Sequence, residues 1–243
     1  MFSPATVGFY TRAVSLKDMV TTYSSSSLTK VFYPVLSSLQ HDHVQFSRVY
    51  FKVISVIAFL SFGLTGVLYV LGADIIILLF GAKWAPSIQI FQILILSVCN
   101  YPLNSMMVNA FMSKGKSREN FAIGILRKFV RVIPLLFAFF YGIYEFTVAA
   151  VIVSYFLTVL NVLFLRKFAQ LELTKHFIKI FEGLAPLIIL IVTFQLVDFS
   201  TIELRLLLVF GFLVFYLSFN WFIKAEGLIF IWQSGLNMRK IFL

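Results

Sequence analysis

The long uncharged apolar runs of this chain constrain its fold more than any other feature. A helix needs about 20 apolar residues to cross the roughly 30 Å hydrocarbon core of a bilayer. Three runs reach that length without a charged residue, at residues 53–73, 85–113 and 146–165. Each run is predicted to span a membrane, and the second is long enough to tilt or kink.

The composition agrees with a lipid environment. The chain has 243 residues, of which 60% are hydrophobic and 12% are charged, and it contains 30 phenylalanines. A soluble domain usually carries about 25% charged residues, and a globular core of this length could not bury so much apolar surface. The sequence therefore predicts an all-α, polytopic membrane helix bundle.

Four further segments complete the predicted bundle. Residues 121–144 are expected to form one helix with a basic first half, and residues 183–197 and 206–223 to form a helical hairpin. The turn of this hairpin contains Asp198, Ser200 and Glu203. Residues 17–40 are rich in Ser and Thr, so a span there must turn its polar face toward protein or a water-filled cavity. The total is about seven transmembrane helices.

The placement of basic residues supports this count. The net charge is +10, but the basic residues punctuate apolar runs instead of forming one water-exposed patch. This pattern disfavours nucleic-acid binding and favours a role in membrane topology. Alternate loops collect 15 of the 20 Lys and Arg residues, which are Arg48, Lys52, Lys114, Lys116, Arg118, Arg127, Lys128, Arg131, Arg166, Lys167, Lys175, Lys179, Lys224, Arg239 and Lys240. These loops are predicted to be cytoplasmic. The C-terminus is therefore expected on the cytoplasmic side of a cell (inner) membrane, and the N-terminus on the opposite side.

No metal or cofactor site is expected. Cys99 stands alone inside an apolar run, so an internal disulfide is excluded and the partners of a redox or metal motif are missing. His41 and His43 lie in a predicted cytoplasmic turn without further ligands nearby. The carboxylates of the non-cytoplasmic loops are scattered, and no pair has the spacing for acid and base catalysis. An enzyme is therefore disfavoured.

Three motifs resemble the oligosaccharide flippases, which export O-antigen, capsule and exopolysaccharide units. They are VGFYTRA at residues 7–13, TKVFYPVLSSLQ at residues 29–40 and LLFGAKW at residues 78–84. Members of that family have a G-x-Y-x-x-A segment, then a basic residue before a (V/L)-F-P-x-L-S-x-x-Q run, and later L-L-F-G-x-x-W. Gly115 and Lys116 also resemble the Gly-Arg turn of the family.

The resemblance implies an architecture. Full-length members resemble two six-helix lobes followed by two extra helices, and by that comparison this chain supplies helices eight to fourteen. Residues 1–243 would then form one transmembrane domain. Within it, residues 1–170 are an incomplete C-terminal lobe, residues 171–182 a cytoplasmic linker and residues 183–243 the final hairpin with a cytoplasmic tail.

The resemblance also implies a function, which is the flipping of polyprenyl-pyrophosphate-linked oligosaccharides for surface polysaccharide or lipopolysaccharide export. The expected partners are this lipid-linked substrate, membrane lipids and other polysaccharide-assembly proteins. Because alternating access needs two lobes, the chain is expected to be a partial transporter. The alternatives are an inactive remnant, a split subunit that needs a separate N-terminal lobe, or a membrane enzyme of envelope polysaccharide assembly.

An anionic pyrophosphate needs cations where the membrane would otherwise exclude them. Lys30 is the first candidate, because it precedes Tyr33 and Pro34 as the family's basic residue does, and Ser26 lies one helical turn before it. The alternative is that Lys30 reaches from a helix end to the interface. Lys17 and Arg12 are further candidates, with interface anchoring as the alternative. In lipid II flippases a basic residue follows an alanine by two positions, and here Ser15 stands in place of that alanine before Lys17.

Polar residues in the apolar run at residues 85–113 form a second candidate group. Asn100 and Asn104 fall near one helix face with Ser97, and Pro102 is expected to kink the helix. These side chains either line a cavity or form hydrogen bonds between helices. Arg131 is expected at the mouth of the cavity, with Arg127 and Lys128 marking the cytoplasmic boundary.

Overall fold

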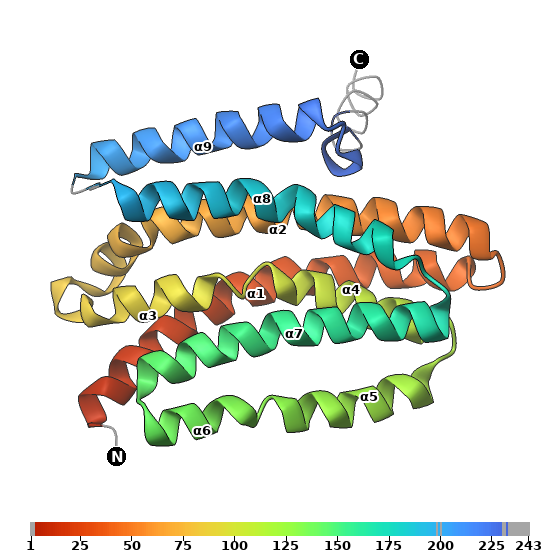
Figure 1. Cartoon of the computed structure of the whole chain (residues 1–243), viewed down its shortest axis with the longest axis horizontal. Coiled ribbons are helices and arrows are strands. Elements are labelled where there is room, and N and C mark those ends of the chain that lie inside the picture. The colour runs from red at the N-terminus through yellow and green to blue at the C-terminus, as the bar shows by residue number, and fades with distance from the viewer. Residues whose placement is uncertain (1–2, 198, 200, 230–231, 233–243) are drawn as a thin grey trace.

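The structure is a layered bundle of helices that run roughly parallel or antiparallel to one another (Figure 1). This computed structural model describes residues 3–197, 199, 201–229 and 232, and for residues 24–31 it describes the backbone alone. Within these residues every regular element is helical. The elements are α1 (Pro4–Ser38), α2 (His43–Phe80), η1 (Ala82–Trp84), α3 (Pro86–Ile95), α4 (Asn100–Ser113), α5 (Ser117–Val130), α6 (Ile133–Phe140), α7 (Ile143–Ala169), α8 (Leu173–Leu196) and α9 (Ile202–Phe222).

Five helical segments among the described residues are long and apolar enough to cross a membrane. They are α2, the combined α3 and α4, α7, α8 and α9. The polar α1 and the interrupted pair α5 and α6 run alongside them through the bundle (Figure 1). The predicted all-α, polytopic membrane bundle is confirmed, and the chain is a multi-pass membrane protein.

The first helix is longer than predicted. A span was expected from residue 17, but α1 begins at Pro4 and has 35 residues. The side chain of Ser3 accepts a hydrogen bond from the Thr6 amide, and a proline fits the first turn because its missing N–H has no helical partner there. At about 1.5 Å per residue, α1 is roughly 50 Å long and exceeds the hydrocarbon thickness.

Two segments that run through the bundle are broken near their middle. The expected kink lies at residues 96–99, between α3 and α4, just before Pro102. The prediction of one helix over residues 121–144 is wrong, because α5 ends at Val130 and α6 begins at Ile133. Pro134 cannot donate to the carbonyl of Val130, and its ring crowds that carbonyl. A proline thus follows each break by a few residues.

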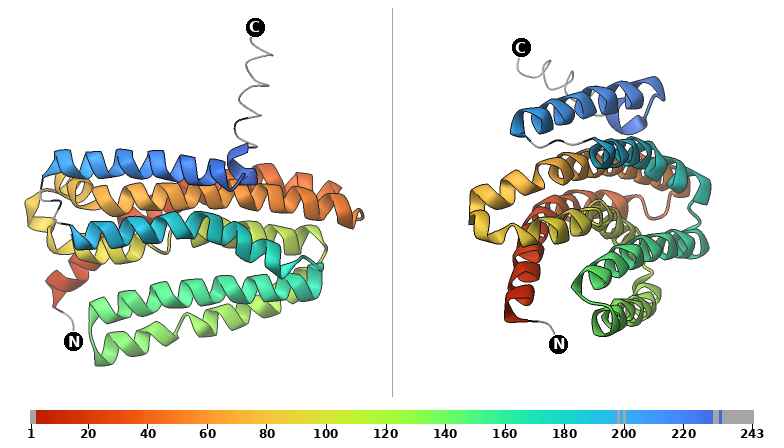
Figure 2. Two further views of the ribbon diagram at one scale, coloured as in Figure 1. Left: turned by 45° about the horizontal axis from the view of Figure 1, so that its top comes forward. Right: turned by 60° about the vertical axis from the view of Figure 1, so that its left-hand side comes forward.

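The final two helices form the predicted hairpin and pack on α2 (Figure 2). Gly183 of α8 lies so close to Phe62 of α2 that an added Cβ would meet the Phe62 Cγ and Cβ atoms at 2.8 and 2.9 Å. Residues 173–182, which the sequence assigned to a linker, form the first part of α8. Asp198 and Ser200 of the predicted turn lie outside the described residues.

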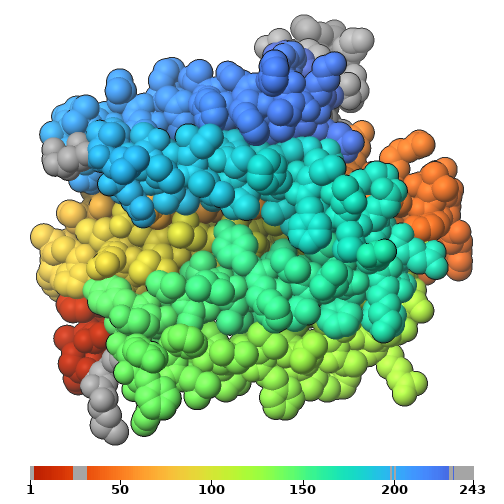
Figure 3. Space-filling view, viewed as in Figure 1, coloured from red at the N-terminus to blue at the C-terminus, as the bar shows by residue number. Residues whose placement is uncertain are grey.

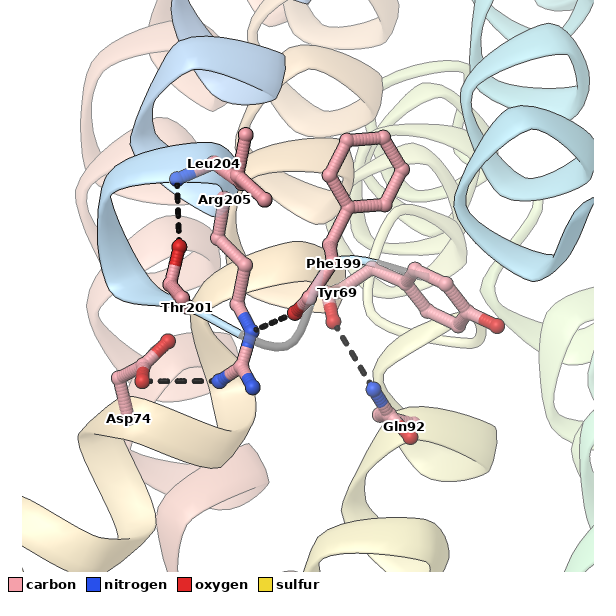
Figure 4. A network of polar contacts seen from close by, with 7 residues as sticks. All are labelled: Tyr69, Asp74, Gln92, Phe199, Thr201, Leu204 and Arg205. Carbon is pink, nitrogen blue, oxygen red and sulfur yellow. Dashed lines mark hydrogen bonds and ion pairs between the residues drawn. The ribbon is translucent and has the colours of Figure 1, made fainter. Parts of the chain in front are cut away.

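An ion pair ties the start of α9 to the end of α2. The Arg205 Nη1 atom lies 2.9 Å from the Asp74 Oδ1 atom, and the Arg205 Nε atom donates to the Phe199 carbonyl at 2.8 Å (Figure 4). Nearby, Gln92 on α3 donates to the Tyr69 carbonyl. Asp74 and Arg205 are 131 residues apart in the sequence, and the fold brings them together.

The two ends of the bundle differ in charge. The turns at residues 39–42, 114–116 and 170–172 gather at one end, which we call the basic end, and those at residues 81–85 and 197–201 gather at the opposite end (Figure 1). The basic end carries Lys114, Lys116, Arg166, Lys167, Lys175 and Lys224. The N-terminus of α1 and the C-terminus of α9 lie at opposite ends of the bundle (Figure 1).

Candidate functional site

A row of polar side chains joins α4 to α7 through the middle of the bundle. The Asn100 Nδ2 atom donates to the Ser154 hydroxyl at 3.2 Å, and the Asn104 Nδ2 atom donates to the Thr158 hydroxyl at 2.9 Å. The Asn161 Nδ2 atom donates to the Asn104 Oδ1 atom. We call these five residues the polar ladder. Because lipid offers no hydrogen bonds, such groups stabilise a bundle only when they meet one another or water.

The same helix supports the break between α3 and α4. The Tyr155 hydroxyl donates to the Leu96 carbonyl at 2.8 Å, which satisfies an acceptor that the break removes from the helical pattern. The Ser97 hydroxyl donates to the Leu94 carbonyl at 2.7 Å. Irregular backbone at membrane depth is tolerated only where protein or water satisfies its polar groups. Side-chain hydroxyls therefore satisfy backbone carbonyls at this break and stabilise it.

A cavity of about 600 Å³ lies beside the polar ladder, between α4, α5, α6 and α7. It has a polar side and an apolar side. Its lining residues are Tyr101, Asn104, Ser105, Val108, Asn109, Arg127, Arg131, Pro134, Phe146, Ala150, Val153, Ser154, Leu157 and Asn161. Figure 3 shows the face of the bundle on which α5, α6, α7 and α8 lie.

Two arginines enter the cavity lining at the break between α5 and α6. Arg127 and Arg131 lie 10 and 14 residues after Ser117, which is about 15 and 20 Å along the helix from the basic end. Both arginines therefore lie far from the basic end along this helix, and the expectation that Arg127, Lys128 and Arg131 mark the cytoplasmic boundary stays a prediction.

The Arg127 guanidinium retains hydrogen-bonding capacity. Its Nη2 atom donates to the Asn120 Oδ1 atom at 3.0 Å, whereas its buried Nε atom has no hydrogen-bond partner among the described residues. A buried N–H without a partner is costly unless a ligand or water accepts from it. The N-terminus of α6, with its partial positive charge, begins two residues after Arg131. This side of the cavity is suited to an anion.

Lys17 lies at the edge of the same region. It is 8% exposed, and its Nζ atom lies 2.8 Å from the Asp18 Oδ1 atom and donates to the Tyr101 hydroxyl at 3.3 Å. Tyr101 lines the cavity. The structure thus places Lys17 one side chain away from the cavity wall.

The other predicted site residues divide into three groups. Asn104 and Arg131 line the cavity, and Asn100 belongs to the polar ladder behind it. Arg12 lies away from the cavity, with its guanidinium over the rings of Phe80 and Trp84 at 4.9 and 4.6 Å. That geometry fits an interface anchor. For Lys30 and Ser26 only the backbone, within α1, is described; a substrate role for them stays a prediction.

Sequence reasoning missed the α7 half of the site. Ser154, Thr158 and Asn161 recur at spacings of four and three residues in an otherwise apolar run, which is the pattern of one helix face. That pattern could have identified them. Tyr101 had no comparable signal, because an aromatic residue in an apolar helix is more often part of the core. No group of three or more potential metal ligands occurs among the described residues.

Three comparisons relate this architecture to known proteins. A family model described as "Polysaccharide biosynthesis protein" matches residues 1–89. An "Uncharacterized membrane protein in cps region" from Klebsiella pneumoniae is 26% identical over 113 residues, which is 46% of this chain and 23% of that protein. The solved structure of the lipid II flippase MurJ in an inward closed conformation superposes with a TM-score of 0.69 and 18% identity, covering 92% of this chain and 48% of MurJ.

The chain therefore spans about half the length of MurJ, and its alignment covers less than a quarter of the Klebsiella protein. At 18% identity the likeness to MurJ establishes the fold and nothing finer. The family description, "Polysaccharide biosynthesis protein", applies to the matched residues 1–89. These comparisons agree with the resemblance to polysaccharide flippases that the motifs indicate, and the chain is a multi-pass membrane protein with a MurJ-like fold.

Proposed function

We propose that this chain takes part in moving lipid-linked oligosaccharides across a cell membrane, and that the cavity beside the polar ladder receives the pyrophosphate and its first sugars. The observation that carries the proposal is the pair of cavity-lining arginines, Arg127 and Arg131, about 15 and 20 Å along the helix from the basic end of the bundle. Intramembrane charges are costly and are retained mainly where they face a substrate path or a partner. Two positive side chains suit a pyrophosphate.

The rest of the cavity supports the same reading. Asn104 and Asn161 supply amide groups for sugar hydroxyls, and Tyr101 and Phe146 supply ring faces and edges. The two broken segments, α3 with α4 and α5 with α6, both contribute residues to this cavity. Transporters commonly build midplane sites from interrupted helices. The flippase-like fold favours transport over an enzyme reaction. Export of a surface polysaccharide such as O-antigen is the finer form of this proposal.

We further propose that the basic end faces the cytoplasm of an inner membrane, with the C-terminus inside. The support is the concentration of Lys and Arg residues at that end. Because the chain spans about half of MurJ, we propose that transport needs a second lobe. An inactive remnant remains the competing proposal.

Export in living cells tests the cavity. In a strain that lacks this gene and is complemented with variants, Arg127→Gln and Arg131→Gln should each reduce surface polysaccharide about tenfold or more, since a charge-assisted hydrogen bond contributes roughly 1.5–3 kcal/mol. Lys128→Gln is the matched control, because Lys128 lies at the same depth and does not line the cavity.

The level of each variant in the membrane is measured alongside export. Cells with the arginine variants should accumulate the lipid-linked precursor, whereas the Lys128 variant should export normally. Equal export by all three variants at equal membrane abundance would rule out the arginines as substrate ligands.

A further inference from the structure

The VGFYTRA and LLFGAKW motifs meet in the fold, away from the cavity beside the polar ladder. Both contribute to one pocket of about 420 Å³, which is lined by Pro4, Val7, Gly8, Thr11, Arg12, Ser15 and Trp84. Trp84 belongs to the turn at the end of the bundle opposite the basic end, where α1 also begins (Figure 1). Tryptophan favours the membrane–water interface, so this pocket, which we call the interface pocket, is expected at the level of the lipid headgroups.

The Arg12 guanidinium is positioned in the interface pocket by aromatic rings. Its Cζ atom lies over the Phe80 and Trp84 rings, 4.9 and 4.6 Å from their centres. The Phe9 ring meets the Trp84 ring edge-on, with the two ring centres 5.8 Å apart. Stacking uses the flat face of a guanidinium and leaves the N–H donors at its edge. No group among the described residues accepts a hydrogen bond from Arg12, so these donors are available to a ligand.

The charges around the interface pocket favour an anion. Arg12 is the one charged residue among the described residues that line the pocket, and no carboxylate belongs to that lining. Asp18 is the one acidic residue in the α1 sequence, and its Oδ1 atom already lies 2.8 Å from the Lys17 Nζ atom. Ser15 follows Arg12 by three residues on the same helix face and adds a hydroxyl donor.

We propose that the interface pocket binds the phosphate group of a membrane lipid. The edge of the Arg12 guanidinium donates to two phosphate oxygens in parallel, and the Ser15 hydroxyl donates to a third. Phosphate is the anion that a pocket at headgroup level meets most often. It comes either from a phospholipid of that leaflet or from a lipid-linked glycan that has crossed the membrane. This site is separate from the cavity and does not require the anion site proposed there.

Trp84 provides a fluorescent reporter of this binding. The chain has three tryptophans, and Trp221→Phe with Trp232→Phe leaves Trp84 alone. This full-length parent chain, in an uncharged detergent without phosphate, is titrated with dioctanoyl phosphatidic acid and with farnesyl phosphate. These probes carry the same phosphate monoester on a glycerolipid and on a prenyl chain. Trp84 emission should change saturably with at least one of them, whereas the phosphate-free dioctanoylglycerol and farnesol should cause no change.

Substitutions in the interface pocket identify the groups that bind phosphate. Arg12→Gln should weaken binding about tenfold or more, the usual effect of losing a charge-assisted hydrogen bond. Arg12→Lys keeps the charge but loses the parallel donors, so it should bind less tightly than the parent chain. Gly8→Leu should abolish the response by filling the pocket, and nothing lies within 4 Å of an added Cβ there to disturb folding. Lys83→Gln, beside Trp84 but outside the lining, is the matched control and should bind as the parent chain does.

The two probes identify the source of the phosphate. Tighter binding of farnesyl phosphate indicates the lipid-linked glycan, and equal or tighter binding of phosphatidic acid indicates a phospholipid; both results support the site. The response should persist after Arg127→Gln with Arg131→Gln, which separates this pocket from the cavity.

Three results would overturn the proposal. They are equal responses to the phosphate lipids and their phosphate-free counterparts, no response to either phosphate lipid, and unchanged affinity in both Arg12→Gln and Gly8→Leu. A response that disappears with the two cavity arginines would assign the phosphate to the cavity and would also overturn the interface pocket as a separate site.

Discussion

The Asn104 side chain has more hydrogen-bond partners among the described residues than any other side chain of the polar ladder. Its amide nitrogen donates to the Asn100 carbonyl and the Thr158 hydroxyl, both at 2.9 Å, and its oxygen accepts from Asn161. Asn104→Ala should lower stability by about 1 kcal/mol, since hydrogen bonds between membrane helices average roughly 0.6 kcal/mol with a maximum near 1.7. Thermal unfolding in detergent measures the change.

Thr193→Ala provides the control for this experiment, because the Thr193 hydroxyl donates to the Ile189 carbonyl of its own helix. It should leave the unfolding temperature nearly unchanged. An Asn104 variant as stable as the Thr193 variant would contradict a structural role for the polar ladder.

The Asp74–Arg205 ion pair makes a second prediction for single residues. Each side chain is about one-fifth exposed, at 23% for Asp74 and 20% for Arg205, so the pair falls between exposed pairs of about 0–1 kcal/mol and buried pairs of several. A double-mutant cycle of Asp74→Asn and Arg205→Gln should give a coupling free energy of about 1–2 kcal/mol. Additive effects of the two changes would show that the pair does not join α2 to α9.

The sequence predicted some residues of the site and not others for a physical reason. Asn104 and Arg131 could be selected because a polar or charged side chain in an apolar run is costly without a role. The depth of Arg131 in the bundle could not be predicted, because it depends on where the helix breaks. The Asp74–Arg205 pair was also beyond reach, since 131 residues separate its members.

A glycine allows two helices, α8 and α2, to pack closely against each other. Gly183 allows α8 to approach the Phe62 side chain of α2, including its rigid Cβ atom. Gly183→Ala should destabilise the chain by about 1–3 kcal/mol, as overpacking usually does. Gly211→Ala on α9 is the matched control, because nothing lies within 4 Å of an added Cβ there.

The control variant should be neutral or slightly stabilising, since alanine favours a helix over glycine by up to about 1 kcal/mol. Thermal unfolding of both variants in the same detergent gives the comparison. Equal unfolding temperatures for the two variants would mean that α8 and α2 do not approach this closely.

The helices that could be predicted from the sequence are those that contain a long apolar run. The runs at residues 53–73 and 146–165 lie inside α2 and α7, because an uncharged run of that length has few other solutions. The break between α5 and α6 was not predicted, since Pro134 was read as part of a continuous helix. The start of α1 was missed because its polar residues hide it from a hydropathy criterion.

The sidedness of the bundle is a prediction for the whole molecule. Cys99 is fully buried and is the single cysteine in the sequence, so an introduced cysteine can be labelled against a low background. Lys83→Cys, at the opposite end, should react with a membrane-impermeant maleimide in intact cells. Arg118→Cys, at the basic end, should react only after permeabilisation. The reverse pattern would invert the proposed topology.

The central claim is that the cavity beside the polar ladder receives a lipid-linked sugar. Replacing Val108, which lines the cavity, by a photoreactive phenylalanine analogue in export-competent cells tests this claim most directly. The same replacement at Phe210, which is 69% exposed on α9, reports contacts with the surrounding lipid. Irradiation should yield a glycan-bearing adduct at Val108 and none at Phe210. Glycan adducts absent from Val108, or equally abundant at both positions, would contradict the account.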